Sequence, residues 1–169
     1  MRMKIAGLLI CLALPAAAEN VPMARIYSTG NMMYEGDSWE CIQISSTMGW
    51  QRYVPPHEPG LYGHDFYNMT ISADQEGWTV DKARYARVLN GGHTGADARA
   101  LSPYDGYKYD QSYPFGALLL RYKDGTTRAL MREDPGGTSW DFGNDPLFDF
   151  RINDTGFGDN AGVLKICFW

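Results

Sequence analysis

Short runs in which apolar and polar residues alternate dominate this sequence, and long runs with the spacing of an amphipathic helix are scarce. Residues 39–45 show the pattern well, with Ile42 and Ile44 on one face and Cys41 and Gln43 on the other. Alternation with a period of two, bounded by turn residues, is typical of β-strands. The pattern therefore predicts an all-β fold.

Similar patterns continue along the chain. Residues 24–28 predict an early strand, and residues 117–122 predict a central one. Lys123-Asp124-Gly125 carries the Asp-Gly signature of a hairpin turn, so residues 126–131 are predicted to return beside the central strand.

Two C-terminal segments complete the predicted strands. Residues 147–152 alternate, with Asp149 and Arg151 predicted to face solvent and the apolar positions predicted to face the core. Residues 163–169 alternate in the same way and predict the last strand.

An insertion of about residues 54–113 separates the early strands from the central ones. It contains Pro55-Pro56 and Pro59, with many Tyr and Gly residues and few aliphatic runs. A structureless loop of this length is uncommon in a compact domain, and its tyrosine content speaks against disorder. We therefore expect small elements within it, including a short strand or helix near residues 79–89.

The N-terminus has the pattern of a secretory signal peptide. Arg2 and Lys4 precede an almost wholly apolar run at residues 5–14, and small residues end at Ala18, where cleavage is expected. The run is too short to span a bilayer. A lipoprotein signal ending at Cys11 is the weaker alternative, because a bulky residue precedes that cysteine. Residues 1–18 are thus predicted to leave residues 19–169 as one domain, periplasmic or secreted and without a membrane span.

The charge balance is acidic. The full chain carries 15 Lys and Arg against 20 Asp and Glu. Loss of the signal removes Arg2 and Lys4 and no acidic residue, leaving 13 basic residues against 20 acidic ones. This balance argues against nucleic acid or an anionic membrane as the partner, and it suits a protein that gathers cations.

Two cysteines, Cys41 and Cys167, remain after the predicted cleavage. Both lie on the strand face opposite the main aliphatic stripe. In an oxidising compartment such a pair usually forms a disulfide, and the alternative is two separate buried thiols.

The candidate chemistry lies in the loop at residues 153–160, Asn-Asp-Thr-Gly-Phe-Gly-Asp-Asn. It holds four side-chain oxygen donors, from Asn153, Asp154, Asp159 and Asn160, between two predicted strands. Calcium prefers hard oxygen ligands in flexible geometry, and two carboxylates held close together would repel each other without a cation. The alternative is that Asn, Asp and Gly here serve only as turn formers. The spacing is not that of an EF-hand.

Three blocks of the sequence resemble the bacterial galactophilic lectins of the PA-IL-like family. The first runs from residue 28 to Gly49-Trp50-Gln51-Arg52-Tyr53, the second is residues 115–120, and the third is Ile152-Asn153-Asp154 followed by residues 159–164. The resemblance covers about half of the chain after the signal. It implies a jelly-roll-like antiparallel β-sandwich with one calcium ion at its edge.

The resemblance also implies a set of calcium ligands. These are the side chains of Asp154, Asp159 and Asn160, a carbonyl near Thr155, and the carbonyl of Tyr53. In such lectins two sugar hydroxyls complete the ion's coordination. The loop here is shorter than in the family, and Asp159 stands where the family has Asn.

The insertion replaces the segment that supplies the family's further sugar contacts. If the Tyr53 carbonyl reaches the ion, the insertion begins beside the site, and His57, His64 and Asp65 would lie near enough to contact a bound ligand. These residues match no zinc or catalytic motif, so surface histidines are the alternative interpretation.

These features predict an exported, calcium-dependent carbohydrate-binding protein that recognises sugar and is not an enzyme, and the resemblance suggests a galactose-type sugar. The first alternative keeps the calcium ion as a purely structural group, in an envelope or secreted module that binds a protein partner. The second is an enzyme built around His57, His64 and Asp65, although no catalytic motif is present.

Overall fold

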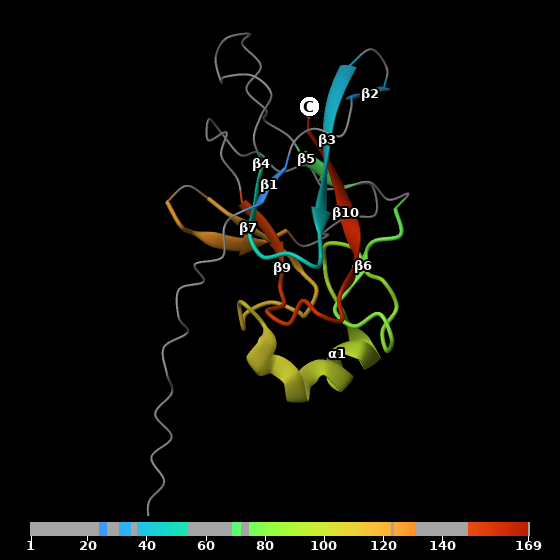
Figure 1. The fold of residues 1–169 in the computed structure, drawn as a ribbon, viewed down its shortest axis with the longest axis vertical. Coiled ribbons are helices and arrows are strands. Elements are labelled where there is room, and N and C mark those ends of the chain that lie inside the picture. The colour runs from blue at the N-terminus through green and yellow to red at the C-terminus, as the bar shows by residue number, and fades with distance from the viewer. Residues whose placement is uncertain are drawn as a thin grey trace, which may run out of the picture.

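The structure, a computed structural model, describes residues 24–26, 31–34, 37–53, 69–71, 75–122, 124–130 and 149–168. The described chain is mostly β-strand, with one short α-helix and one 3-10 helix at one end of the molecule (Figure 1). This confirms the all-β prediction.

The first sheet has five strands in the order β1-β4-β9-β7-β8. Their bounds are β1 Ala24–Ile26, β4 Gln51–Tyr53, β9 Asp149–Ile152, β7 Leu118–Arg121 and β8 Thr127–Ala129. Strands β1 and β4 are parallel, and the other described pairs of this sheet are antiparallel. The β7–β8 hairpin turns at Gly125, whose φ of 87° suits glycine, as the Asp-Gly signature predicts.

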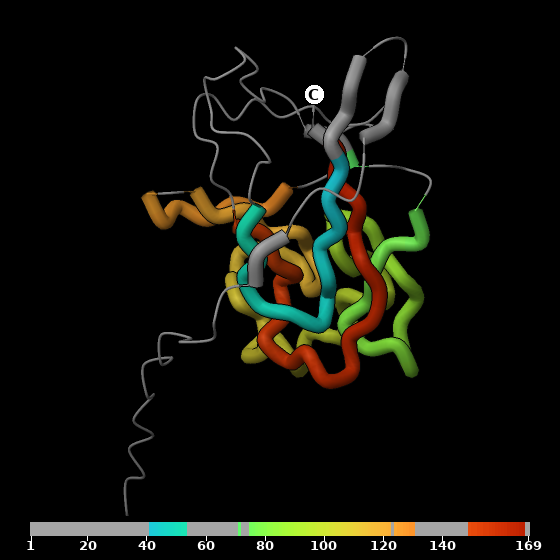
Figure 2. The backbone as a smooth tube through the Cα atoms, turned by 45° about the horizontal axis from the view of Figure 1, so that its top comes forward, coloured from blue at the N-terminus to red at the C-terminus, as the bar shows by residue number. Residues whose placement is uncertain are grey.

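The second sheet has the order β2-β3-β10-β5, and β6 also pairs with β10. Its strands are β2 Asn31–Tyr34, β3 Asp37–Ser45, β10 Ala161–Phe168, β5 Met69–Ile71 and β6 Trp78–Thr79. All of these pairs are antiparallel. Figure 2 shows β10 and the coloured part of β3, from Cys41 onward, running side by side.

Both sheets contribute to one hydrophobic core. Ile42, Ile44, Leu164 and Ile166 enter it from the second sheet, which confirms the alternation predicted for these strands. The first sheet adds Tyr53, Leu118, Leu120, Phe150 and Ile152. Burial of these apolar side chains is the main source of the fold's stability.

The outer face of β9 differs from the prediction. Asp149 and Arg151 alternate with the core residues as expected, but both are buried, and Arg151 has no exposed surface. Asp149 accepts hydrogen bonds from Arg52 Nε at 2.8 Å and from Arg121 Nη2 at 3.0 Å. A buried charge is tolerated when it is paired in this way, so alternation located the face correctly but not its environment.

The predicted insertion carries small elements of its own. Strand β6, Trp78–Thr79, and its bridge from Trp78 to Val88 lie at the start of and within the region predicted near residues 79–89, whereas the helix α1, Gly95–Leu101, lies farther along the chain. The 3-10 helix η1, Ser102–Tyr107, follows it directly. No helix in the described part is long and apolar enough to cross a membrane.

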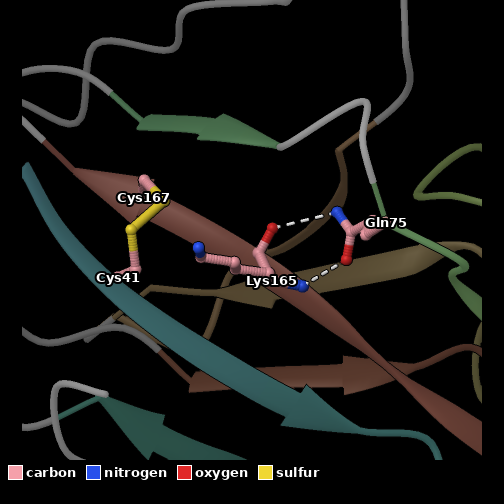
Figure 3. The surroundings of a disulfide bond; sticks show 4 residues. All are labelled: Cys41, Gln75, Lys165 and Cys167. Atoms are coloured by element: carbon pink, nitrogen blue, oxygen red, sulfur yellow. Dashed lines mark hydrogen bonds between the residues drawn. A yellow bond between two sulfur atoms is a disulfide. The ribbon is translucent and has the colours of Figure 1, made fainter. Parts of the chain in front are cut away.

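The predicted disulfide is confirmed. Cys41 and Cys167 are directly opposite each other on β3 and β10, and a bond joins their sulfur atoms (Figure 3). Beside it, Gln75 Nε2 donates to the Lys165 carbonyl at 3.0 Å, and its Oε1 accepts from the Lys165 amide. The disulfide and Gln75 thus both fasten β10, the strand that pairs with three others.

Candidate functional site

The loop at residues 153–160 links β9 to β10 at the end of the molecule that carries α1 (Figure 1). Asp154 lies at its start and is buried. Its Oδ1 accepts a hydrogen bond from the Gly156 amide at 2.8 Å, which closes a tight turn around the carboxylate.

The Asp154 carboxyl is in an environment that disfavours its charge. Burial raises its pKa above the usual value, and the nearby Asp159 carboxylate raises it further. The Gly156 amide and the Asn160 side chain oppose this rise. A cation at the carboxylate would favour the ionised form, because an opposite charge acts against both causes of the rise.

Asn160 supplies an acceptor that lacks a donor. The residue is 3% exposed, and its Nδ2 donates to the Ser46 carbonyl at 2.9 Å, so the amide orientation is fixed. Among the described residues, no hydrogen-bond donor reaches its buried Oδ1. Leaving a buried acceptor unsatisfied costs about 1–3 kcal/mol, and a cation would satisfy it.

Asn153 has a structural role instead. Its Nδ2 lies within hydrogen-bond distance of the carbonyls of Asp110, Tyr113 and Pro114, and its Oδ1 accepts from the Asp110 amide at 2.8 Å. One side chain therefore holds the turn at 110–114. Of the four oxygen donors in the loop's sequence, this one is already engaged.

Thr155 also fastens a neighbouring segment. Its amide and its hydroxyl both donate to the Tyr107 carbonyl, each at 2.8 Å. The end of η1 is thereby attached to the loop. The carbonyl near Thr155 that the sequence predicted as a ligand belongs to this fastened turn.

The structure does not bring Tyr53 to the loop. The register of β4 on β9 aligns Gln51 with Phe150 and Arg52 with Asp149, so Tyr53 lies beyond Asp149 at the end of β9 remote from Asp154. Five residue steps lead from Asp149 to Asp154, on the order of 15 Å when extended. The prediction of a Tyr53 carbonyl ligand is therefore not supported by the strand register. His57, His64 and Asp65 lie outside the described residues.

A pocket with a volume of about 260 Å³ adjoins the loop. Asp154, Gly156 and Asp159 line it from the loop, and the rest of the lining comes from the segment at 80–85 and from α1, η1 and Phe115. The remaining lining residues are Val80, Asp81, Arg84, Tyr85, Leu101, Tyr104 and Tyr107. The pocket thus combines three carboxylates with three tyrosines and a phenylalanine.

Two contacts fix the walls relative to each other. The Lys82 amide donates to the Asp159 carbonyl at 2.9 Å, which ties the segment at 80–85 to the loop. The two bonds from Thr155 to Tyr107 tie η1 to the loop on the other side. The sequence shows the insertion to be rich in tyrosine, but no pattern in it pointed to Tyr104 or Tyr107 as pocket residues, nor to Asp81 or Tyr85.

A stack of cations and aromatic rings lies next to the loop. The Arg151 guanidinium lies 4.0 Å from the centre of the Tyr109 ring and 5.4 Å from that of Trp50, and Arg121 lies 4.3 Å from the Trp50 ring. Arg151 Nη2 donates to the Asp154 carbonyl at 2.8 Å. This buried cation therefore holds the backbone of the loop at Asp154.

The donor set suits a hard cation. In the described part of the chain, no three His, Cys, Asp or Glu side chains gather closely enough to form a metal site by themselves. The oxygens that remain are the carboxylates of Asp154 and Asp159 and the Asn160 Oδ1. Calcium commonly combines carboxylates with amide and backbone oxygens and water, so these residues fit it.

No known protein family, curated protein or solved structure matches this chain. The class of the protein therefore has to be inferred from the loop and the pocket.

Proposed function

We propose that this protein binds carbohydrate in the pocket beside the loop at residues 153–160, with a calcium ion held by that loop. The proposal includes the lectin-like β-sandwich and the kinship with galactophilic lectins that the sequence blocks suggest. The observation that carries it is the pocket itself, because two loop carboxylates and several aromatic rings line the same small space.

The cation would be held by Asp154, Asp159 and the Asn160 Oδ1. The Asn160 acceptor is already oriented by its bond to Ser46, and Asp154 is held by the Gly156 amide. When bound, calcium supplies a positive centre that accepts oxygen ligands such as hydroxyls. Loop carbonyls and water would complete its coordination.

The aromatic walls suit the apolar faces of a sugar ring. The Tyr107 side chain is exposed, with 59% of the residue's surface accessible, and its backbone is held by Thr155. A ligand can therefore contact the ring with little further loss of backbone conformational entropy. Drug-sized ligands occupy pockets of roughly 300–1,000 Å³. The pocket here, at about 260 Å³, is slightly smaller and suits a single sugar unit.

Export to the periplasm or beyond is part of the proposal. The Cys41–Cys167 disulfide is compatible with an oxidising compartment.

Calcium binding is tested by thermal unfolding with calcium and with chelator. At a hundredfold excess over its dissociation constant, calcium should add about 2.7 kcal/mol of stability, a rise in Tm of roughly 5–10 °C. Asp154→Asn should remove most of this rise. Asp124→Asn is the matched control, because Asp124 also accepts from the amide two residues on, at 2.8 Å, but lies exposed in the β7–β8 turn. An equal Tm in calcium and chelator would refute the cation site.

Sugar binding is tested by titrating galactosides and other monosaccharides at saturating calcium and again in chelator. Affinities of about 10 µM to 1 mM are expected, near 4–7 kcal/mol. Tyr107→Ala should weaken binding, and Tyr107→Phe, which keeps the ring, should preserve most of it. Binding that survives chelation would place the sugar elsewhere.

The second candidate is a structural calcium ion in a module that binds a protein partner. One observation favours it: the carbonyls of Asp154 and Asp159 are already bonded to Arg151 and Lys82, so the loop is tied into the fold on both sides. A rise of Tm in calcium without binding of any sugar would decide for this candidate.

A further inference from the structure

His93 is a buried ionisable residue next to the pocket and outside its lining. It is 1% exposed. In the part of the chain that the structure describes, neither ring nitrogen has a hydrogen-bond partner. A buried polar group without partners is costly, so its presence calls for an explanation.

Backbone contacts place this ring behind the pocket wall. The His93 amide donates to the Phe115 carbonyl at 2.8 Å. A Cβ added to the next residue, Gly116, would lie 3.1 Å from His93 Cδ2, so the ring packs directly on that glycine. Tyr85 meets the ring edge-on, with ring centres 5.5 Å apart. Phe115 and Tyr85 both line the pocket.

The ionisable groups facing His93 come from two elements. On α1, the Asp97 carboxylate lies 3.6 Å from Nδ1 and is partly exposed, and Tyr85 approaches from the segment at 80–85. On the third side the ring meets Gly116 and, beyond it, the apolar Val80. A protonated ring would have one carboxylate beside Nδ1, while Nε2 would face glycine and an aliphatic side chain.

We propose that His93 is a pH-sensitive latch, whose protonation releases the wall formed by Tyr85 and Phe115 and opens the pocket. In the closed state the neutral ring fills the space between α1, Tyr85 and Gly116. The charged ring cannot be solvated there, so it moves toward water and Asp97 and leaves the wall without support. Release of a ligand by this opening rests on the proposed function, whereas the opening itself does not.

Burial lowers the pKa of His93, and Asp97 opposes this only in part. In an open state the ring would return toward its ordinary value of about 6.5. At pH values between the lowered pKa of the closed state and the ordinary pKa of the open state, the open state therefore binds more protons than the closed one. Across that window, the ratio of open to closed molecules increases about tenfold for each unit by which the pH falls.

Hydrogen exchange measures the opening without any ligand. At pH 5, after correction for intrinsic rates, the amides of His93 and residues 115–117 should exchange about tenfold or more faster than at pH 7. Amides of β3 and β10 serve as the internal reference. His93→Gln, which cannot gain a charge in this range, should abolish the pH dependence.

A variant with both His57→Gln and His64→Gln keeps His93 as the sole histidine of the chain. Its ring signal in an NMR titration should have a midpoint below 6.5 that coincides with the change in exchange. This variant decides the matter even if His93→Gln fails to fold. The latch would be overturned if the His93 ring titrated at its ordinary value and the amide exchange rates did not change with pH. It would also be overturned if a folded His93→Gln variant kept the pH dependence of amide exchange.

A parallel titration with galactoside at pH 7 and pH 5 separates the two proposals. Weaker binding at pH 5 in the wild type, with equal binding in His93→Gln, supports ligand release by the latch. Equal binding at both pH values in the wild type, despite faster exchange, would overturn ligand release. Absence of binding at both would count against the proposed function, while the exchange data still decide the opening.

Discussion

At the scale of single residues, Asn153 makes the largest number of fixed contacts in the candidate loop. It is fully buried, and its amide group meets three carbonyls and one amide of the turn at 110–114. This turn leads into Phe115 and therefore into the pocket wall. Asn153 stabilises the site without being available to a ligand.

Asn153→Ala should lower the free energy of unfolding by about 2–4 kcal/mol, because it removes several hydrogen bonds and leaves backbone groups of the turn without partners. Urea denaturation in chelator measures this without any contribution from a cation. Gln111→Ala is the control, since Gln111 is exposed and bonds to the neighbouring Asp105 carbonyl. Equal losses in the two variants would contradict the special role of Asn153.

The residue scale also shows what the sequence could not predict. Asp154 and Asn160 were identified from composition and spacing, and the structure buries both, with Asp154 also lining the pocket. The strand register, which depends on the whole sheet, gives no support to Tyr53 as a ligand, because it aligns β4 with the start of β9 and not with the loop. Asp81 and Tyr85 reach the pocket through folding of a segment that lacks any periodic pattern.

At the scale of elements, the approach of β6 to β10 depends on glycine. Gly162, with a φ of 97°, pairs with Trp78, and a Cβ there would lie 2.4 Å from the Gly77 carbonyl oxygen. Its own carbonyl accepts bonds from the amide and the hydroxyl of Ser46. This contact fixes the beginning of β10 directly after the candidate loop.

Gly162→Ala should therefore cost about 3 kcal/mol or more, from backbone strain together with a clash against backbone. Gly125→Ala separates these two contributions, because Gly125 also has a positive φ but open space around it, and it should cost only about 1–2 kcal/mol. Denaturation curves of the two variants give the comparison. Equal losses of stability in the two variants would show that the contact with β6 adds no steric destabilisation to Gly162→Ala.

Elements were predictable where the pattern is long. Strands β3 and β10 have nine and eight residues, and their alternation predicted both the strands and their core faces. Helix α1 has only seven residues, too few to show the apolar periodicity from which a helix is predicted, and Thr94 at its N-cap makes no side-chain cap hydrogen bond. The sharp turns of the insertion depend on tertiary contacts that alternation does not encode.

At the scale of the whole molecule, the disulfide closes a loop over a sequence separation of 126 residues. In the chain-entropy model, a loop of this length contributes about 5 kcal/mol by restricting the unfolded chain. Cys41→Ala combined with Cys167→Ala should lower stability by about that amount. The urea m-value should rise as well, because the unfolded chain becomes more expanded. A double variant whose midpoint of unfolding in urea equals that of the wild type would contradict this account.

The same bond determines how the molecule carries a mechanical load. A tension applied between the two chain ends passes from Cys41 straight to Cys167, so the strands and the pocket between them lie outside the line of force. Single-molecule pulling should therefore show little extension from this span until a reductant cleaves the bond. Cleavage should release about 440 Å, at roughly 3.5 Å for each of the 126 residue steps. An oxidised molecule pulled by its ends would thus keep its candidate binding site intact under loads that extend the reduced chain.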